Sequence, residues 1–284
     1  MFKSLLSSRR LKDAFFYKFK GTWIWGNFRF YGNQTLYSLR FPAIKPIIDV
    51  IMHVFYCPDI SGEVIALPEE EARHAGQVLR LSEGDSIQVV DGKGKRYTGS
   101  ISTISKKKCQ VRLLDEEVLP RERSYYTHLV FAPTKNIART EWLLEKATEI
   151  GVDEITPIFT FHSERRRLRH DRLQRILLAA VKQSQRTWLP VLNDPLSFEV
   201  FLDQDFGESQ CLLAYIDNLV TARLKDTYHP SADVIIAIGP EGGFSAAEAE
   251  KARVHGFSSV SLGPYRLRTE TAGIVALQTI HLIN

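Results

Sequence analysis

From residue 126 onward, short apolar runs alternate with longer, more polar stretches that are typical of helices. The apolar runs occupy residues 127–132, 155–159, 211–215, 234–238 and 260–262, and each has the length of a buried strand. The stretches at residues 136–150, 171–185, 245–255 and 269–282 predict helices, and residues 171–185 are amphipathic. Strands that alternate with helices predict an α/β domain built on a parallel sheet.

Two of these helices begin or end with capping residues. Asn136 can accept a hydrogen bond at the start of the first helix, and Gly151 stands where a left-handed residue would end it. Ser245 and Glu248 have the spacing of a capping box, in which two side chains satisfy the first free amides of a helix. The predicted boundaries therefore rest on hydrogen bonding as well as on periodicity.

Residues 53–119 have a different rhythm, with strand-like runs at 86–90, 97–104 and 109–114. The glycine-containing segment 91–94 separates the first two runs and predicts a hairpin. Pro68 and the three glutamates that follow predict a helix that reaches about Arg80. We expect a small β-barrel here, and a linker at residues 120–124.

The first 51 residues differ from the rest in composition. They hold nine Lys and Arg against two Asp, a net charge of +7, so the remaining 28 basic and 31 acidic residues have a net charge of −3. Twelve of the 30 aromatic residues also lie in this leader, which has no clear helical or strand period. Met52 is the one methionine besides Met1, so we expect the native start at Met52. The alternatives are a poorly ordered basic extension and a transit peptide.

Composition limits the remaining possibilities. The chain is 44% hydrophobic and 25% charged, and no uncharged apolar run approaches the length of a membrane helix, so no membrane partner is expected. Its three cysteines are far apart and lack metal-ligand spacing, which predicts neither a disulfide framework nor a metal site. A cytoplasmic protein is expected, because free cysteines suit a reducing compartment.

Two glycine-bearing loops follow predicted strands, at residues 238–244 and 262–272. Ligands of open α/β sheets bind beyond the carboxyl ends of strands, and glycine lets the backbone approach a ligand closely. Neither loop has the spacing of a dinucleotide fingerprint or a P-loop. Thr269 or Thr271 can cap the helix after the second loop. Each loop alone could be an ordinary strand-to-helix turn, but two in succession favour one shared pocket.

A run of arginines follows the strand at 155–159, in a domain that is otherwise slightly acidic. Arginine suits bidentate contact with phosphate, so this run is the candidate RNA surface; the alternative is a solvated helix face. Residues 182–186 lie at a helix end and, taken alone, are typical of a frayed terminus. His74 is expected to be structural.

Taken in order, these segments resemble the RsmE family of SPOUT methyltransferases. The resemblance covers the chain from about Met52 to its end. It is carried by residues 74–81, 84–85, 91–92, 141–151, 163–165, 182–184, 239–244 and 262–272. The last two segments are the most specific, whereas many members have Glu where this chain has Lys182. The leader has no counterpart.

The resemblance implies S-adenosylmethionine-dependent methylation of N3 of a specific uridine in 16S rRNA of the small ribosomal subunit, without a metal. It implies a PUA-like β-barrel at residues 52–120 and a SPOUT domain at 125–284, whose parallel sheet ends in a C-terminal trefoil knot. A homodimer with the knot at the interface is also implied. The alternatives are an RNA-binding ribosome-assembly factor with the same fold and a tRNA ribose 2′-O-methyltransferase.

The functional residues follow from the same segments. Cofactor contacts are expected at Ile238, Gly239, Glu241, Gly242, Gly243, Leu262, Gly263, Leu267, Arg268, Thr269, Thr271 and Ala272. RNA contacts are expected at Arg165, Arg166, Arg167, Arg169, Arg172, Gln183, Ser184 and Arg186. Uracil N3 carries a proton, so a base or an anion-stabilising cation is needed. The candidates are Glu270, Glu241 and Arg268, and the base is not assigned.

Overall fold

A computed structural model describes residues 14–19, 22–27, 52–121, 123–215 and 222–284. Residues 1–51 and 52–284 form separate compact units. In the first unit, β1 (Ala14–Phe19) and β2 (Thr22–Asn27) form an antiparallel pair, which the sequence pattern did not predict. Two predictions concern this leader, namely the native start at Met52 and the alternative of a poorly ordered extension. Most of the leader lies outside the described residues.

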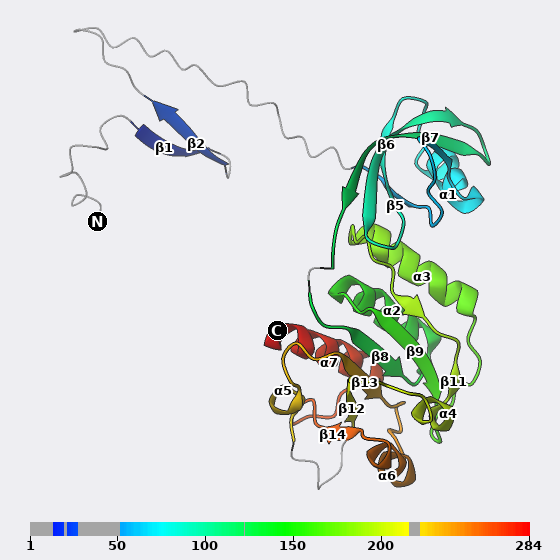
Figure 1. Ribbon diagram of the computed structural model, residues 1–284, viewed down its shortest axis with the longest axis vertical. Coiled ribbons are helices and arrows are strands. Elements are labelled where there is room, and N and C mark those ends of the chain that lie inside the picture. The colour runs from blue at the N-terminus through cyan, green and yellow to red at the C-terminus, as the bar shows by residue number, and fades with distance from the viewer. Residues whose placement is uncertain (1–13, 20–21, 28–51, 122, 216–221) are drawn as a thin grey trace, which may run out of the picture. The chain divides into compact units, whose positions relative to one another are not determined.

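The segment after Met52 forms a five-stranded sheet in the order β3-β5-β6-β7-β4. Its strands are β3 (Val54–Tyr56), β4 (Val64–Ala66), β5 (Ser86–Val90), β6 (Lys95–Ile104) and β7 (Cys109–Val118). The β5–β6 hairpin is confirmed, and Gly92 and Gly94 take the positive φ values that it needs. Strand β7 runs four residues beyond the predicted 109–114, because it pairs along the full length of β6. The five strands and α1 are seen together in Figure 1. The core of this sheet includes Phe55, Ile87 and Val111.

The helix predicted from Pro68 to Arg80 is shorter and less regular than expected. Pro68 is its N-cap, α1 covers Glu69–Arg73, and a π-helical turn covers His74–Val78. Arg80 has φ 56°, a left-handed conformation that stops the helix.

The second sheet confirms the predicted parallel α/β domain. Its order is β10-β9-β8-β13-β12-β14, with β11 also paired to β9, and all these pairs are parallel. The strands are β8 (Thr127–Phe131), β9 (Glu154–Phe159), β10 (Val191–Leu192), β11 (Leu196–Ser197), β12 (Gln210–Ala214), β13 (Val234–Ile238) and β14 (Ser258–Val260). Strands β8 and β13 are buried along their whole length. Strand β13 pairs with β8 from the first half of the domain and with β12 from the second half.

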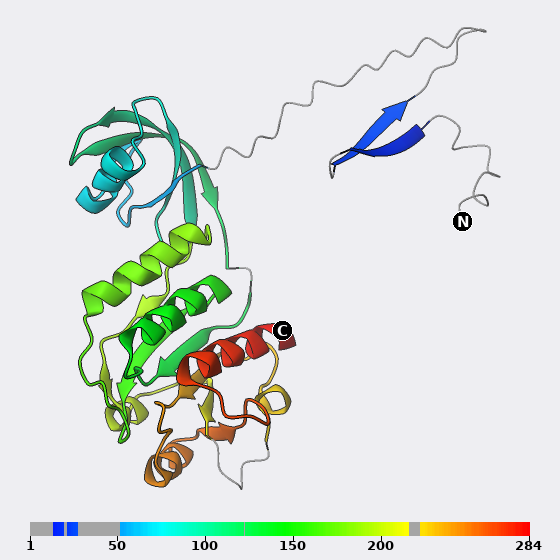
Figure 2. The same cartoon turned by 180° about the vertical axis from the view of Figure 1, so that it is seen from behind.

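Successive residues of the central strands face two different hydrophobic cores, as the period of a strand requires. Leu129 and Ile236 face the core beneath α2, α3 and α7. Val130 and Ile235 face the core beneath α4 and α6. Both views of the ribbon show these helices on the two faces of the sheet (Figures 1 and 2). The sheet is thus buried on both sides, which explains its nearly continuous apolar strands.

Most of the predicted helices are confirmed within a few residues. The confirmed helices are α2 (Ile137–Ile150), α3 (His170–Gln183), α6 (Ala246–Val254) and α7 (Thr269–Ile283). Two short helices, α4 (Phe198–Leu202) and α5 (Leu224–Thr227), were not predicted. Asn136 accepts a hydrogen bond from the Ala138 amide, and Gly151 has φ 116°. The capping box of Ser245 and Glu248 is complete.

Two details of the C-terminal region were predicted wrongly. Strand β14 ends at Val260, because its pairing with β12 stops at Ala214; residues 261 and 262 already belong to the loop. The N-cap of α7 is Arg268, and no side chain caps this helix. The expected capping hydroxyl of Thr269 donates instead to the carbonyl oxygen of Gly239. Among the described residues, no helix is both long and apolar enough to cross a membrane.

Candidate functional site

Three neighbouring strands end at one level of the α/β sheet. Ala214 pairs with Ile238 on one side and with Val260 on the other, and each is the last residue of its strand. Their carboxyl ends border a cavity of about 410 Å³. Its walls comprise Ala214, Tyr215, residues 238–244, Val260, residues 262–267, Thr269 and Ala272. The sheet therefore brings the two predicted loops to the edge where an α/β fold binds its ligand.

The first loop is built from glycines that could not carry side chains without strain. A Cβ on Gly242 would lie 2.9 Å from Cβ of His162, and one on Gly239 would lie 3.1 Å from the Phe244 ring. Gly243 has φ 73°, where other residues are disfavoured. The loop thus presents main-chain atoms to the cavity, with little side-chain bulk.

Hydrogen bonds fasten the second loop onto the first. The Arg266 guanidinium donates to the Glu241 carbonyl oxygen over 2.9 Å. The buried Thr269 hydroxyl donates to the Gly239 carbonyl oxygen over 3.0 Å. Two segments that are 25 and 30 residues apart in the chain therefore form one rigid wall.

The cavity contains ten of the twelve residues expected to contact a cofactor. The two exceptions are Arg268 and Thr271, which are exposed at the start of α7 and do not line it. Ala214 and Tyr215 were not predicted, because nothing in the sequence indicates that β12 would lie between β13 and β14. Five further lining residues within the chosen loops were also not singled out: Pro240, Phe244, Pro264, Tyr265 and Arg266.

The two candidate carboxylates occupy different environments. Glu241 is exposed at the cavity wall, where its Oε1 accepts a hydrogen bond from the Lys135 amide over 3.0 Å. Glu270 is 8% exposed, does not line the cavity, and has its Oε1 3.7 Å from Nε of Arg139. Its buried Oε2 has no hydrogen-bond partner among the described residues. Only Glu241 is therefore in direct reach of a ligand in the cavity.

A tight turn at residues 160–163, most of which was not predicted, supports the first loop. Nδ1 of His162 lies 3.0 Å from the Gly243 carbonyl oxygen, and Oγ of Ser163 accepts from the Thr160 amide. The Phe161 amide donates to Glu248, while Phe161 as a whole is 73% exposed. The predicted arginine run begins directly after this turn.

Most of the arginines in that run are already engaged within the protein. Arg165 donates to the carbonyl oxygens of Thr134 and Lys135, and Arg166 to that of Thr160. Arg172 forms an ion pair of 2.6 Å with Glu141. Arg169 pairs with Asp171, and Arg167 is exposed. The run therefore combines structural bonds near the cavity with an exposed basic surface.

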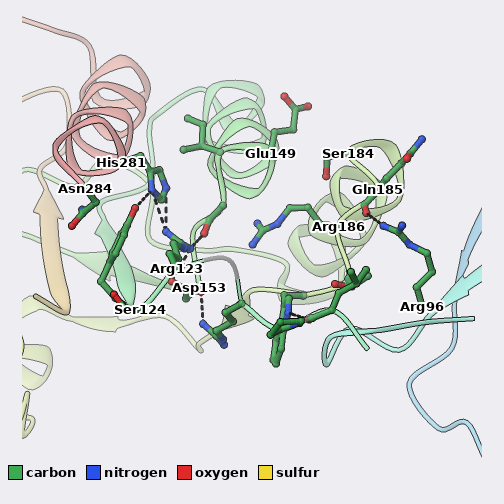
Figure 3. A pocket seen from close by; sticks show the side chains of 18 of the residues that line it. Arg96, Arg123, Ser124, Glu149, Asp153, Ser184, Gln185, Arg186, His281 and Asn284 are labelled. Carbon is green, nitrogen blue, oxygen red and sulfur yellow. Dashed lines mark hydrogen bonds and ion pairs between the residues drawn. The ribbon is translucent and has the colours of Figure 1, made fainter. Parts of the chain in front are cut away.

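The helix end at residues 182–186 contacts the β-module. Nζ of Lys182 lies 2.6 Å from Oε1 of Glu71, so this lysine forms a structural ion pair across to α1. The Ser184 hydroxyl donates to the Ala180 carbonyl oxygen, and Arg186 donates to that of Thr148. Gln183 is exposed. Ser184 and Arg186 line a second, larger cavity of about 1000 Å³ (Figure 3).

Residues 121–281 match the model of an RNA methyltransferase domain, and residues 67–114 match that of an RNA methyltransferase PUA domain. The chain is 32% identical to the ribosomal RNA small subunit methyltransferase E of Synechocystis, over 79% of this chain and 75% of that protein. It is similar to the crystal structure of a probable rRNA-methyltransferase from Porphyromonas gingivalis, with 41% identity, a TM-score of 0.75, and coverage of 82% and 98%. The ribosomal RNA small subunit methyltransferase E of Neisseria gonorrhoeae, bound to S-adenosyl methionine, gives 30% identity, a TM-score of 0.73, and coverage of 82% and 98%.

Proposed function

Because this chain belongs to the ribosomal RNA small subunit methyltransferase E family, we propose that it methylates N3 of a uridine in 16S rRNA, using S-adenosylmethionine. The observation that carries this proposal is the cavity of about 410 Å³ at the ends of β12, β13 and β14. The experiment that tests it is transfer of a labelled methyl group to small ribosomal subunits that lack the modification. Free 16S rRNA is run beside them, to learn whether the folded subunit is required.

The residues of this cavity suit S-adenosylmethionine. A cavity of this volume falls in the ordinary range for small-molecule sites, about 300–1000 Å³. The glycine-rich wall leaves backbone amides and carbonyls to hold the cofactor, and a Cβ at Gly242 would close part of the loop against His162. When bound, the cofactor supplies an electrophilic methyl group on a sulfonium sulfur. We assign its contacts to the ten predicted residues that line the cavity.

The protein must also prepare the acceptor nitrogen. We assign to Glu241 the role of general base, because its exposed carboxylate lines the cavity, whereas that of Glu270 does not. In this scheme the Glu241 carboxylate would accept the N3 proton, which frees a lone pair on N3 to take the methyl group while the bond between that methyl and the cofactor's sulfur breaks. Arg266, also on the wall, would stabilise negative charge on the uracil oxygens. Glu270 would act through Arg139, by holding the start of α7.

A prediction separates the two carboxylates. In single-turnover methyl transfer, Glu241→Gln is expected to lower the rate about 10²- to 10⁴-fold, the usual contribution of a general base. The loss should shrink as pH rises, because solvent hydroxide then removes the N3 proton. Glu270→Gln should keep most of the rate. If Glu270→Gln is the slow variant, the base is Glu270; if neither is slow, neither carboxylate is the base.

Assembly and RNA contact complete the proposed function. We propose a PUA-like barrel at residues 52–120 and a SPOUT domain at 125–284, with a knot formed where residues 262–268 pass the 238–244 loop. The protein acts as a homodimer with this region at its interface, in the cytoplasm. The exposed arginines Arg167 and Arg169, with Gln183, are assigned to RNA. Light scattering of the purified protein tests the dimer directly.

A further inference from the structure

The larger cavity is a cleft between the β-module and the α/β domain. It is lined by Arg96 from β6, by residues 119–121 and 123–125 after β7, and by residues 184–188 after α3. The ends of α2 and α7 close it on the remaining side, at Gly151 and at His281. Figure 3 shows Arg96 on the side of the β-module and the Arg123–Asp153 pair deeper in the α/β domain. No predicted cofactor residue lines this cleft.

Positive side chains outnumber negative ones in the cleft. Four arginines line it (Arg96, Arg121, Arg123 and Arg186), against the carboxylates of Glu149 and Asp153. Asp153 is the centre of the buried network, bonded to both Arg121 and Arg123, and Glu149 is paired with Lys146. The two carboxylates are thus already neutralised by cations of the protein.

The lining histidine reflects the same excess of positive charge. Burial lowers the pKa of His281 to about 4, and the charges of Arg123 and Arg186 contribute to this shift, with only Asp153 opposing them. The imidazole is therefore neutral at pH 7. An anion entering the cleft would meet guanidinium groups, while the side-chain carboxylates of the lining are already paired.

A flat stacking surface accompanies the charges. The Arg121 guanidinium lies over the Trp188 ring, 4.6 Å from its centroid, and 5.3 Å from the centroid of Tyr126. Trp188 is fixed in place because its Nε1 donates to the Leu119 carbonyl oxygen. Aromatic rings and arginine planes beside a basic groove are the combination that binds single-stranded nucleic acid.

We propose that this cleft binds a single-stranded segment of the substrate RNA, with phosphodiesters on Arg96, Arg121 and Arg186 and a base stacked at Trp188. The proposal rests on the rRNA substrate assigned above. It adds a site that is separate from the cofactor cavity and lies at the opposite ends of the strands. The cleft adjoins the amino ends of β8 and β9, whereas the cofactor cavity lies at the carboxyl ends of β12 to β14.

The separation follows from strand length. A five-residue strand such as β13 is about 17 Å long, so one protomer cannot place the same nucleotide in both sites. The cleft therefore holds RNA at a distance from the reacting uridine of that protomer. Such an anchor would contribute to the affinity for a large RNA and leave the chemistry to the cavity.

Binding of a fluorescein-labelled hexauridylate to the full chain tests the cleft without methyl transfer. The double variant Arg96→Gln with Arg121→Gln removes two cations whose side chains are 24% and 38% exposed. The matched control, Lys225→Gln with Arg253→Gln, removes two exposed cations from α5 and α6. Two lost phosphate contacts should reduce the slope of log Kd against log salt by about 1.4, while the control leaves it unchanged. An unchanged slope in the cleft variant would overturn the proposal.

Wild-type protein provides a second measurement that does not depend on any variant folding. Photo-crosslinking with a 5-iodouridine oligonucleotide should label peptides that contain Tyr125, Tyr126 or Trp188. Labelling confined to other peptides would contradict the proposal. If crosslinks form in the cleft but no methyl group is transferred, the proposed activity is contradicted and the RNA site in the cleft is still supported.

Discussion

At the residue scale, Asp153 connects the segment after β7 with the first strands of the α/β sheet. Its carboxylate accepts hydrogen bonds from Arg121, from Arg123, and from the amide and hydroxyl of Thr127. Its side chain is 4% exposed. One buried charge therefore holds together parts of the chain that are about 30 residues apart.

Asp153→Asn should be strongly destabilising. The amide keeps the shape of the carboxylate but leaves two arginines without their counter-charge, and breaking a buried pair costs about 3–5 kcal/mol. Urea unfolding followed by circular dichroism measures the loss. Asp194→Asn is the matched control, because the Asp194 side chain is 93% exposed and should change stability by less than about 0.5 kcal/mol. Equal stability of the two variants would show that the network contributes little.

His281 predicts a pH dependence of stability. Its pKa is lowered to about 4 in the folded protein, mainly by burial, from an ordinary value of 6.5. Between these two values the unfolded chain binds the proton more readily, so the free energy of unfolding falls as pH falls from 6.5 towards 4. His128, also with its pKa lowered to about 4 by burial, acts in the same window. His281→Gln should therefore flatten this part of the pH profile only in part, measured by urea unfolding at several pH values. An identical profile in this variant would contradict the assignment.

Single residues also show the limit of prediction from sequence. Gly239, Gly242 and Gly243 could be chosen because they directly follow an apolar strand, which is where an α/β fold binds its ligands. The partners of Arg172 and Lys182 could not be predicted from the sequence, because Glu141 and Glu71 are 31 and 111 residues away in the chain. Long-range ion pairs leave no local signal, so an arginine run looks the same whether it binds phosphate or carbonyl groups.

At the scale of elements, α7 positions the cofactor cavity through its first residue. Thr269 is 3% exposed and its hydroxyl holds the Gly239 carbonyl oxygen, while Ala272 lines the cavity one turn later. The helix thus connects the second loop to the first.

Thr269→Val should weaken the binding of S-adenosylmethionine while leaving the fold intact. Valine has the same shape but no hydroxyl, and one lost buried hydrogen bond costs about 1–3 kcal/mol, or roughly 5- to 150-fold in Kd if it is expressed wholly in binding. Isothermal titration calorimetry measures the affinity. Thr269→Ser keeps the hydroxyl and should retain most of the binding. Wild-type affinity in the valine variant would show that this bond does not shape the cavity.

Regular elements were predictable where two local signals agreed. α2 and α6 each follow an apolar strand and begin at a capping side chain, and both were placed within a residue. The short elements α4, α5, β10 and β11 have two to five residues and no such agreement. The end of β14 was misplaced because apolar Leu262 continues the run, although the chain has already turned into the cavity wall there.

At the scale of the whole molecule, the two cavities lie at opposite ends of the strands of the α/β sheet. The carboxyl ends of the strands border the glycine loops and Glu241, and the amino ends border the arginine cleft beside the β-module. The β-module, the parallel sheet and the two loops were predictable through periodicity and the family resemblance. The cleft was not, because Arg96, Arg121 and Arg186 converge only through the packing of one domain on the other.

The most direct test of the proposed activity is the identity of the methylated nucleoside. Small ribosomal subunits that lack the modification are incubated with the protein and S-adenosylmethionine, and the 16S rRNA is digested to nucleosides for mass spectrometry. We expect 3-methyluridine with the wild-type chain and much less of it with Glu241→Gln. Methylation of ribose 2′-hydroxyls, or no methylated nucleoside at all, would contradict the proposed activity.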